Sequence, residues 1–163
     1  MAYIDLEYYT SLYGEIFIKD FERLSWDACR KLDAETTGID GVKKLKVAFP
    51  TDEDDAEAVK RCACALVNTM AEIEKAEKSA AAARGYEETE GGMRGKVISS
   101  MSAANESISY ATSAINSATA IDKAVSNMAD RNALFSSIIR DYLSGVTDAN
   151  GVCLLYMGPY PAR

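Results

Sequence analysis

The feature that most constrains the fold of this chain is a long helical pattern over residues 52–84. Apolar side chains recur at three- and four-residue spacing on one side of it, at Val59, Ala63, Leu66, Met70 and Ile73. Such spacing is typical of an amphipathic helix with one buried face. An alanine-rich end, residues 79–83, favours the helix and lets another element approach closely.

The start of this helix carries a run of acids, Asp52 to Asp55, directly after Pro50 and Thr51. We predict that Thr51 caps the helix and that Asp54 completes a capping box. Acidic residues in a first helical turn also favour the helix, because they complement its dipole. A calcium loop is the alternative function for the run, but the central glycine and distal glutamate of an EF-hand are missing.

Other helical patterns flank the long one. The sequence predicts helices over residues 6–13, 19–37 and 126–144, a helical turn within 42–47, and a weak helix or linker over 112–124. Asp5 and Gly14 are expected to bound the first of these. Trp26, the sole tryptophan, is expected to be a partly buried packing residue. The fold class is therefore mainly α: a small bundle of four to five helices in a single domain, residues 1–163.

Residues 86–124 have a different composition, and we expect them to form a flexible insertion in the bundle. Glutamates and glycines dominate its first ten residues. Serines then alternate with apolar residues over 97–110, which predicts an extended loop or a β-hairpin arm. A lone hairpin is marginally stable in water, so the arm needs a surface to lie on. Its apolar residues are the candidate oligomerisation contacts: Val97, Ile98, Met101, Ile108 and Tyr110.

The last segment, residues 152–160, is short and apolar. Left in water, such a segment promotes aggregation. We therefore expect its central residues, Leu154, Leu155 and Tyr156, to contact either the body of the protein or a partner.

Charge limits the function classes. The formal net charge of −7 disfavours specific nucleic-acid binding, because the surface repels phosphates. The only dense basic cluster is Lys43, Lys44 and Lys46, which we interpret as a solvated loop. No apolar run is long enough to cross a bilayer, and the first residues lack the pattern of a signal peptide, so we expect no membrane partner.

The residue types also limit the chemistry. The chain has no histidine, so Ser-His-Asp and Cys-His catalysis are excluded in their usual form. Cys62 and Cys64 fall about 200° apart on a helix and are poorly placed to share a metal, so we expect buried, reduced thiols. We expect no cofactor, no metal and no catalytic residue.

The order of these segments resembles the head–tail connector (adaptor) proteins of tailed phages and prophages. The resemblance starts with residues 3–9 before Tyr13 and Gly14, continues through residues 21–33 and the long helix, and closes with residues 142–158. The serine-rich segment 97–110 is similar to the extended loop of that family. The match is a pattern along nearly the whole chain, and the segment 85–123 is longer and richer in serine and alanine than the family leads us to expect.

The resemblance implies a helical subunit of a ring, often of twelve copies, that joins the portal to the tail. Its partners would be other copies of itself, the portal protein and a tail-side completion protein, with DNA passing nearby without specific binding. Its location would be the virion, or the bacterial cytoplasm when expressed from a prophage. Heterologous contacts that close on themselves would make such a ring.

Two other functions fit the same features. One is a helical adaptor or regulator unrelated to virions. The other is a small helical enzyme using carboxylates with a divalent metal, for which Glu87, Glu88 and Glu90 or the acids at 52–55 are the candidates. The enzyme is the least favoured, because metal sites on helices usually pair glutamates with a histidine.

Overall fold

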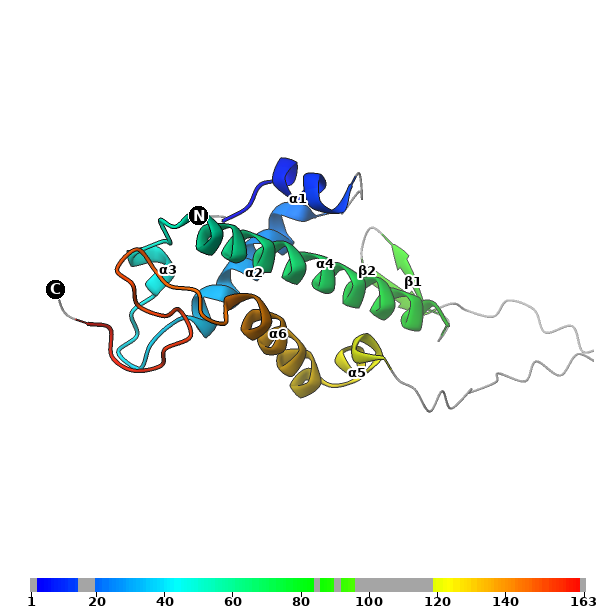
Figure 1. Ribbon diagram of the computed structural model, residues 1–163. Coiled ribbons are helices and arrows are strands. Elements are labelled where there is room, and N and C mark those ends of the chain that lie inside the picture. Colours follow the sequence, from blue (N-terminus) through cyan, green and yellow to red (C-terminus); the bar gives the residue numbers. More distant parts are fainter. Residues whose placement is uncertain (1–2, 15–19, 84–85, 90–91, 96–118, 162–163) are drawn as a thin grey trace, which may run out of the picture.

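The longest helix, α4 (Glu53–Ala83), runs from the end of the molecule that carries the C-terminus to the end that carries a β-hairpin (Figure 1). This computed structural model describes residues 3–14, 20–83, 86–89, 92–95 and 119–161. The other helices are α1 (Leu6–Tyr13), α2 (Phe21–Glu35), α3 (Lys44–Val47), α5 (Ala120–Ser126) and α6 (Met128–Leu143). The predicted fold class, a small helical bundle, is confirmed.

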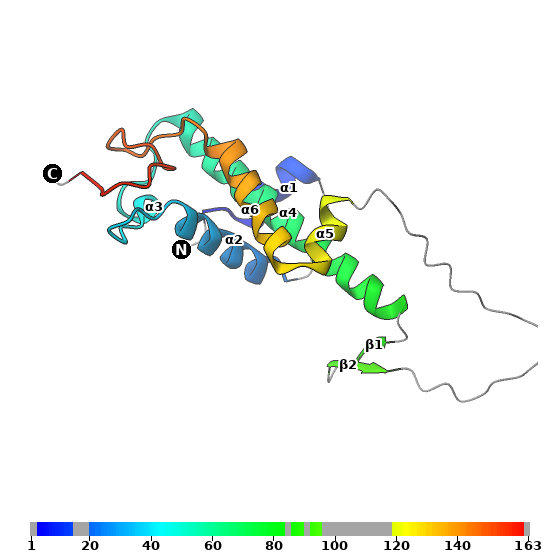
Figure 2. The same ribbon diagram turned by 90° about the horizontal axis from the view of Figure 1, so that it is seen from below.

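Helix α4 is the centre of the packing. It lies against α2, α5 and α6, and α5 and α6 also pack against each other (Figures 1 and 2). The apolar stripe predicted on α4 is largely in the core: Val59, Leu66 and Ile73 are buried, and Met70 is partly buried. The facing helices contribute buried side chains of their own, namely Tyr9, Leu24, Ala28, Leu32, Ala124, Phe135, Ile139 and Leu143. None of the described helices combines the length and the apolar character that crossing a bilayer requires.

The first helix follows the prediction. The Asp5 carboxylate accepts a hydrogen bond from the Tyr8 backbone N–H at 2.8 Å and so caps α1. The second helix is shorter than predicted. Asp20 precedes it in a left-handed conformation, and the Thr36 hydroxyl donates to the Leu32 carbonyl at 2.8 Å where it ends.

The predicted cap of the long helix is wrong by one residue. The Asp52 carboxylate, and not Thr51, accepts hydrogen bonds from the backbone N–H groups of Asp54 and Asp55, both at 3.1 Å. Aspartate caps helices about as well as serine or threonine, so a run of good capping residues leaves the choice to the local backbone.

The described parts of the insertion 86–124 contain regular structure where a flexible stretch was predicted. Strands β1 (Tyr86–Thr89) and β2 (Gly92–Gly95) pair antiparallel beyond the end of α4, with Glu87 opposite Arg94. Helix α5 begins with a capping box between Thr119 and Asp122, which stabilises a short helix that composition alone left undecided.

The prediction for Trp26 is also wrong. Its side chain is 55% exposed, where partial burial was predicted. The buried stripe of α2 includes Leu24, Ala28 and Leu32, as their four-residue spacing predicts. Trp26 lies two positions from Leu24, which turns it away from this stripe. The guanidinium of Arg30 lies 4.8 Å from the centre of its ring.

Candidate functional site at the loop end

The end of the bundle opposite the hairpin is built from two connections, residues 36–50 and 144–161, which we call the loop end (Figure 1). The first leads from α2 through α3 to α4, and the second is the tail that follows α6. Both lie at the surface yet carry buried polar residues, including Thr36, Lys44 and Asp148. Buried polar groups need hydrogen-bond partners, so the loop end is a structured surface.

Its two connections contain the same turn. Residues 37–42 and 147–152 share threonine at the first position, aspartate or asparagine at the fourth, glycine at the fifth and valine at the sixth. Each turn is closed by an antiparallel bridge, Thr37 with Lys43 and Thr147 with Cys153. Gly41 and Gly151 have φ angles of 76° and 75°, which favour glycine.

The second turn is also tied to the start of α4. The Asp55 carboxylate accepts from the backbone N–H of Thr147 at 2.9 Å and from its hydroxyl at 2.8 Å. One member of the acid run thus holds the tail in place. The Asp148 carboxylate accepts from the N–H groups of Asn150 and Val152, which stabilises the turn itself.

Lys44 lies at the centre of the loop end and is fully buried. Its ammonium donates to the carbonyl oxygens of Leu154, at 2.9 Å, and of Tyr156, with Cys153 at 3.4 Å. Burial lowers the pKa of Lys44, since it penalises the charged form. The lysine therefore fastens the tail to α3 from within.

The predicted solvated loop of lysines is therefore wrong for Lys44. Lys43 is exposed, and Lys46 forms an ion pair with the buried Asp33 at 3.1 Å. The three lysines thus have three different environments within four positions. Charge runs usually lie in solvent, but here α3 turns one lysine inward, where the carbonyl oxygens of the tail satisfy it.

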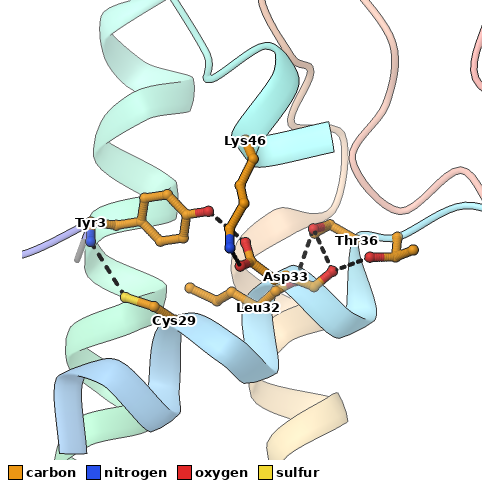
Figure 3. Close-up of polar contacts among 7 residues, drawn as sticks. Tyr3, Cys29, Leu32, Asp33, Thr36 and Lys46 are labelled. Atoms are coloured by element: carbon orange, nitrogen blue, oxygen red, sulfur yellow. Dashed lines mark hydrogen bonds and ion pairs between the residues drawn. The ribbon is translucent and has the colours of Figure 1, made fainter. Parts of the chain in front are cut away.

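Asp33 joins the N-terminal segment to this end (Figure 3). The Tyr3 hydroxyl donates to one of its carboxylate oxygens at 2.5 Å, while Lys46 lies against the other. Burial, followed by the hydrogen bond to Asp33, raises the pKa of Tyr3 well above its ordinary value. The Tyr3 backbone N–H also points to the sulfur of Cys29 at 3.4 Å. Tyr3 therefore stays protonated and acts as a hydrogen-bond donor.

The end of the tail crosses both turns. The backbone N–H of Tyr160 donates to the Asp40 carboxylate at 2.6 Å, and its hydroxyl donates to Asp148. The amide of Asn150 donates to the Tyr160 hydroxyl at 2.6 Å. The N–H groups of Tyr160 and Val42 hold the pKa of Asp40 below its usual range. One tyrosine thus bridges the first turn and the second.

Large apolar side chains remain at the surface of this otherwise well-bonded end. Ile39 is 82% exposed, Met157 60% and Tyr156 49%. The Ile39 N–H donates to the Met157 carbonyl at 3.1 Å, so these residues are neighbours on adjoining loops. We call Ile39, Tyr156 and Met157 the apolar rim. Its backbone is fixed by the hydrogen bonds described above, so exposure here does not come from a loose loop.

The predicted tail contacts divide between the core and this rim. Leu154 is fully buried and belongs to the hydrophobic core, Leu155 packs against that core in a partly buried position, and Tyr156 stands in the rim. The predicted arm contacts Val97, Ile98, Met101, Ile108 and Tyr110 lie outside the described residues.

Sequence reasoning missed Lys44 and Ile39. The signal that could have found them is the repeated Thr-x-x-Asp/Asn-Gly-Val turn, which marks two equivalent connections that can meet at one end. Lys44 and Leu154 occupy the same offset after their turns, and both are fully buried. A buried position in one copy therefore predicts a buried position in the other.

No three histidine, cysteine, aspartate or glutamate side chains cluster as metal ligands in the part of the chain that the structure describes. Burial raises the pKa of both Cys62 and Cys64 to about 12, so both thiols stay protonated at neutral pH. Comparison of the chain with protein-family models, with curated proteins and with solved structures finds no match.

Proposed function

We propose that this chain is a structural subunit of a phage or prophage head–tail connector ring that joins portal to tail. The observation that carries the proposal is the apolar rim held on a well-bonded loop end. Exposed apolar residues on a fixed backbone favour association, because their burial in a contact costs little ordering entropy. We infer the kind of assembly, a ring, from the order of the segments, which resembles that of head–tail connector proteins.

The acidic character of the chain suits this role. With a net charge of −7, the subunit repels phosphates, so DNA could pass a ring of such subunits without sticking to it. The partners would be further copies of the chain, the portal protein on one side and a tail-side completion protein on the other. The serine-rich arm, 97–110, would extend the contact to a neighbouring copy.

Two experiments test the assembly. Mass photometry and negative-stain electron microscopy, over a rising concentration series and with the portal of the same genome, should reveal closed rings. Deletion of residues 97–110 should abolish the rings and leave the helical circular dichroism largely intact. A chain that stays monomeric at every concentration, alone and with the portal, contradicts the proposal.

A matched pair of variants tests the rim. Ile39→Asp places a charge in the rim and should prevent ring formation without loss of helical signal. Met128→Asp is the control, because Met128 is 65% exposed at the first position of α6, where an acid also suits the helix dipole. Rings that form equally well with both variants would mean that the rim is not a contact.

A non-viral adaptor remains the alternative, and the genes beside this one separate the two. Portal, protease and capsid genes next to it favour the connector, whereas regulatory genes favour the adaptor. The metal-dependent enzyme is tested by a thermal-shift scan with Mg²⁺, Mn²⁺ and Ca²⁺. Stabilisation by one of these ions would revive it.

A further inference from the structure

A second apolar surface lies at the start of α2, far from the rim. A groove of about 700 Å³ runs between residues 4–6 of the N-terminal segment and residues 20–26. Leu6 and Trp26 line it and are 51% and 55% exposed. Aromatic side chains with wide exposure are enriched where proteins bind one another. The groove is therefore a candidate contact surface.

The walls of this groove are acidic. Asp5, Asp20 and Glu22 line it, and all three are exposed. Arg23 also lines it, but its guanidinium is bound by the Glu74 carboxylate at 2.8 Å. The groove therefore combines exposed apolar side chains with three exposed acids, and the guanidinium of Arg30 lies over the Trp26 ring. It suits an apolar partner that carries cations at its edges.

The apolar rim has that composition. Ile39, Tyr156 and Met157 provide the apolar side chains. Lys43 follows on the same connection and is exposed, whereas the Lys46 ammonium is paired with Asp33 at 3.1 Å. The Asp40 carboxylate beside Ile39 accepts from the backbone N–H groups of Val42 and Tyr160. Lys43 is therefore the cation that the rim offers to a partner, and it is opposite in sign to the exposed acids of the groove.

One copy cannot join its own groove to its own rim. The groove lies at the first turns of α2, whereas Ile39 follows the other end of that helix. Nine helical positions separate Trp26, the lining residue nearest to that end, from Glu35, which is about 14 Å at 1.5 Å per residue. The helix is rigid over that distance. A contact between two different surfaces of one chain type must then come from a neighbour, and such contacts generate rings or open chains.

We propose that the acid-walled groove of one copy receives the apolar rim of a second copy of this chain. This inference rests on the proposed self-assembly and names its two surfaces. In the contact, Trp26 and Leu6 of one copy cover Ile39 and Met157 of the next. Glu22 and Asp20 stand against Lys43 of the next copy. The contact repeats head to tail, so every subunit uses both of its surfaces.

Trp26 offers a direct test, because it is the sole tryptophan. Its fluorescence should shift to shorter wavelength as the concentration of the full chain rises through the association range. Acrylamide quenching of that fluorescence should fall several-fold over the same range. Sedimentation velocity on the same samples reports the association itself, so the two signals can be compared point by point.

Charge reversal identifies the partner surface. Glu22→Lys and Lys43→Glu should each weaken association at least tenfold at low salt, and the double variant should restore most of it. Glu53→Lys is the matched control for the first, since Glu53 is an exposed acid in the first turn of α4. Lys75→Glu, at an exposed position of α4, is the control for the second. Circular dichroism checks that each variant folds.

The outcomes separate this inference from the proposed function. Rings that form with Trp26 as accessible as in the monomer, and that ignore both reversals, overturn the inference and leave the ring proposal standing. Open filaments with Trp26 protected and with rescue in the double variant support the contact and contradict a closed connector ring. A chain that never associates, alone or with the portal, overturns both.

Discussion

The helical body and the loop end of this protein are held together by different physical means. The body, formed by α1, α2, α4, α5 and α6, depends on apolar burial around α4, with Tyr9, Leu66 and Phe135 among its core residues. The loop end depends on polar groups that are buried together with their partners, such as Lys44 with the tail carbonyls. Apolar burial is non-directional, whereas hydrogen bonds fix positions. The comparison teaches that the body supplies stability and the loop end supplies a defined surface.

The two turns of the loop end can also be compared with each other. Both have the same pattern and the same closing bridge, but the equivalent buried residue is Lys44 after the first and Leu154 after the second. The lysine ammonium donates to the Leu154 carbonyl at 2.9 Å, so the equivalent positions touch. The repeated pattern is therefore asymmetric at this position. That asymmetry is what attaches the tail.

The largest expected effect comes from alkaline pH acting on the body. Burial raises the pKa of Cys62 and Cys64 to about 12 from 9.0, and that of Tyr8 and Tyr9 to about 12 from 10.0. Between the unfolded and native pKa values the native state holds protons that the unfolded chain has released. Stability must therefore fall as pH rises, beginning near 9 and steepening above 10. Urea unfolding at a series of pH values measures this loss.

A matched pair of tyrosine variants sharpens that result. Tyr9→Phe removes a group whose pKa burial raises and should reduce the pH dependence above pH 10. Tyr142→Phe, at a residue that is 39% exposed, is the control for the loss of a phenol at the surface. Lys44 affects the pH dependence in the opposite direction. Because burial lowers its pKa, its contribution to the free energy of unfolding rises with pH. A stability that is flat from pH 8 to pH 12 would show that the thiols and phenols of the body are not buried as described.

The next effect concerns the lysine of the loop end. Lys44→Met keeps much of the side-chain volume but leaves the carbonyls of Leu154 and Tyr156 without their donor. The loss of hydrogen bonds to a charged group costs about 2–3 kcal/mol of the free energy of unfolding. Urea denaturation followed by circular dichroism measures it. Hydrogen exchange of residues 153–157 should speed up by a larger factor than exchange in α4.

Lys43→Met is the control, because Lys43 is the adjacent, exposed lysine. Its effect on the free energy of unfolding should stay within about 0.5 kcal/mol. Equal losses of the free energy of unfolding for Lys43→Met and Lys44→Met would show that the two lysines do not differ in their contacts. That result would also contradict the claim that polar contacts fix the loop end.

Much of the body could be predicted from the sequence, because its signals are local. The first helix has its cap at Asp5, and the stripe of α4 follows helical spacing. Those signals depend on neighbours within a few residues along the chain. Thr51 failed as a cap only because Asp52 beside it is an equally good one.

The loop end could not be predicted in the same way, because its contacts join distant parts of the chain. Lys44 finds its carbonyl partners about 110 positions later, and Asp55 finds Thr147 92 positions later. Composition does not distinguish Lys44 from Lys43 or Lys46, and only its offset from the repeated turn does. The exposure of Trp26 could have been predicted, since it lies two positions from both Leu24 and Ala28 and therefore on the opposite side of α2 from the buried stripe. The repeated turn is the one local signal that points to the site.

The smallest expected effect tests whether the two turns are equivalent. Gly41→Ala and Gly151→Ala each place a side chain at a positive φ, and an added Cβ would meet no atom within 4 Å at either position. The cost should therefore come from the backbone alone, about 1–2 kcal/mol in each case. Thermal unfolding measures both, and equal shifts in Tm are expected if the turns are independent copies. Gly41→Asn should cost less than Gly41→Ala, because asparagine tolerates this conformation. A clearly larger loss for Gly151→Ala would mean that the second turn also sets the carbonyls that hold Lys44, so that the tail, and with it the rim, depends on that turn more than on the first.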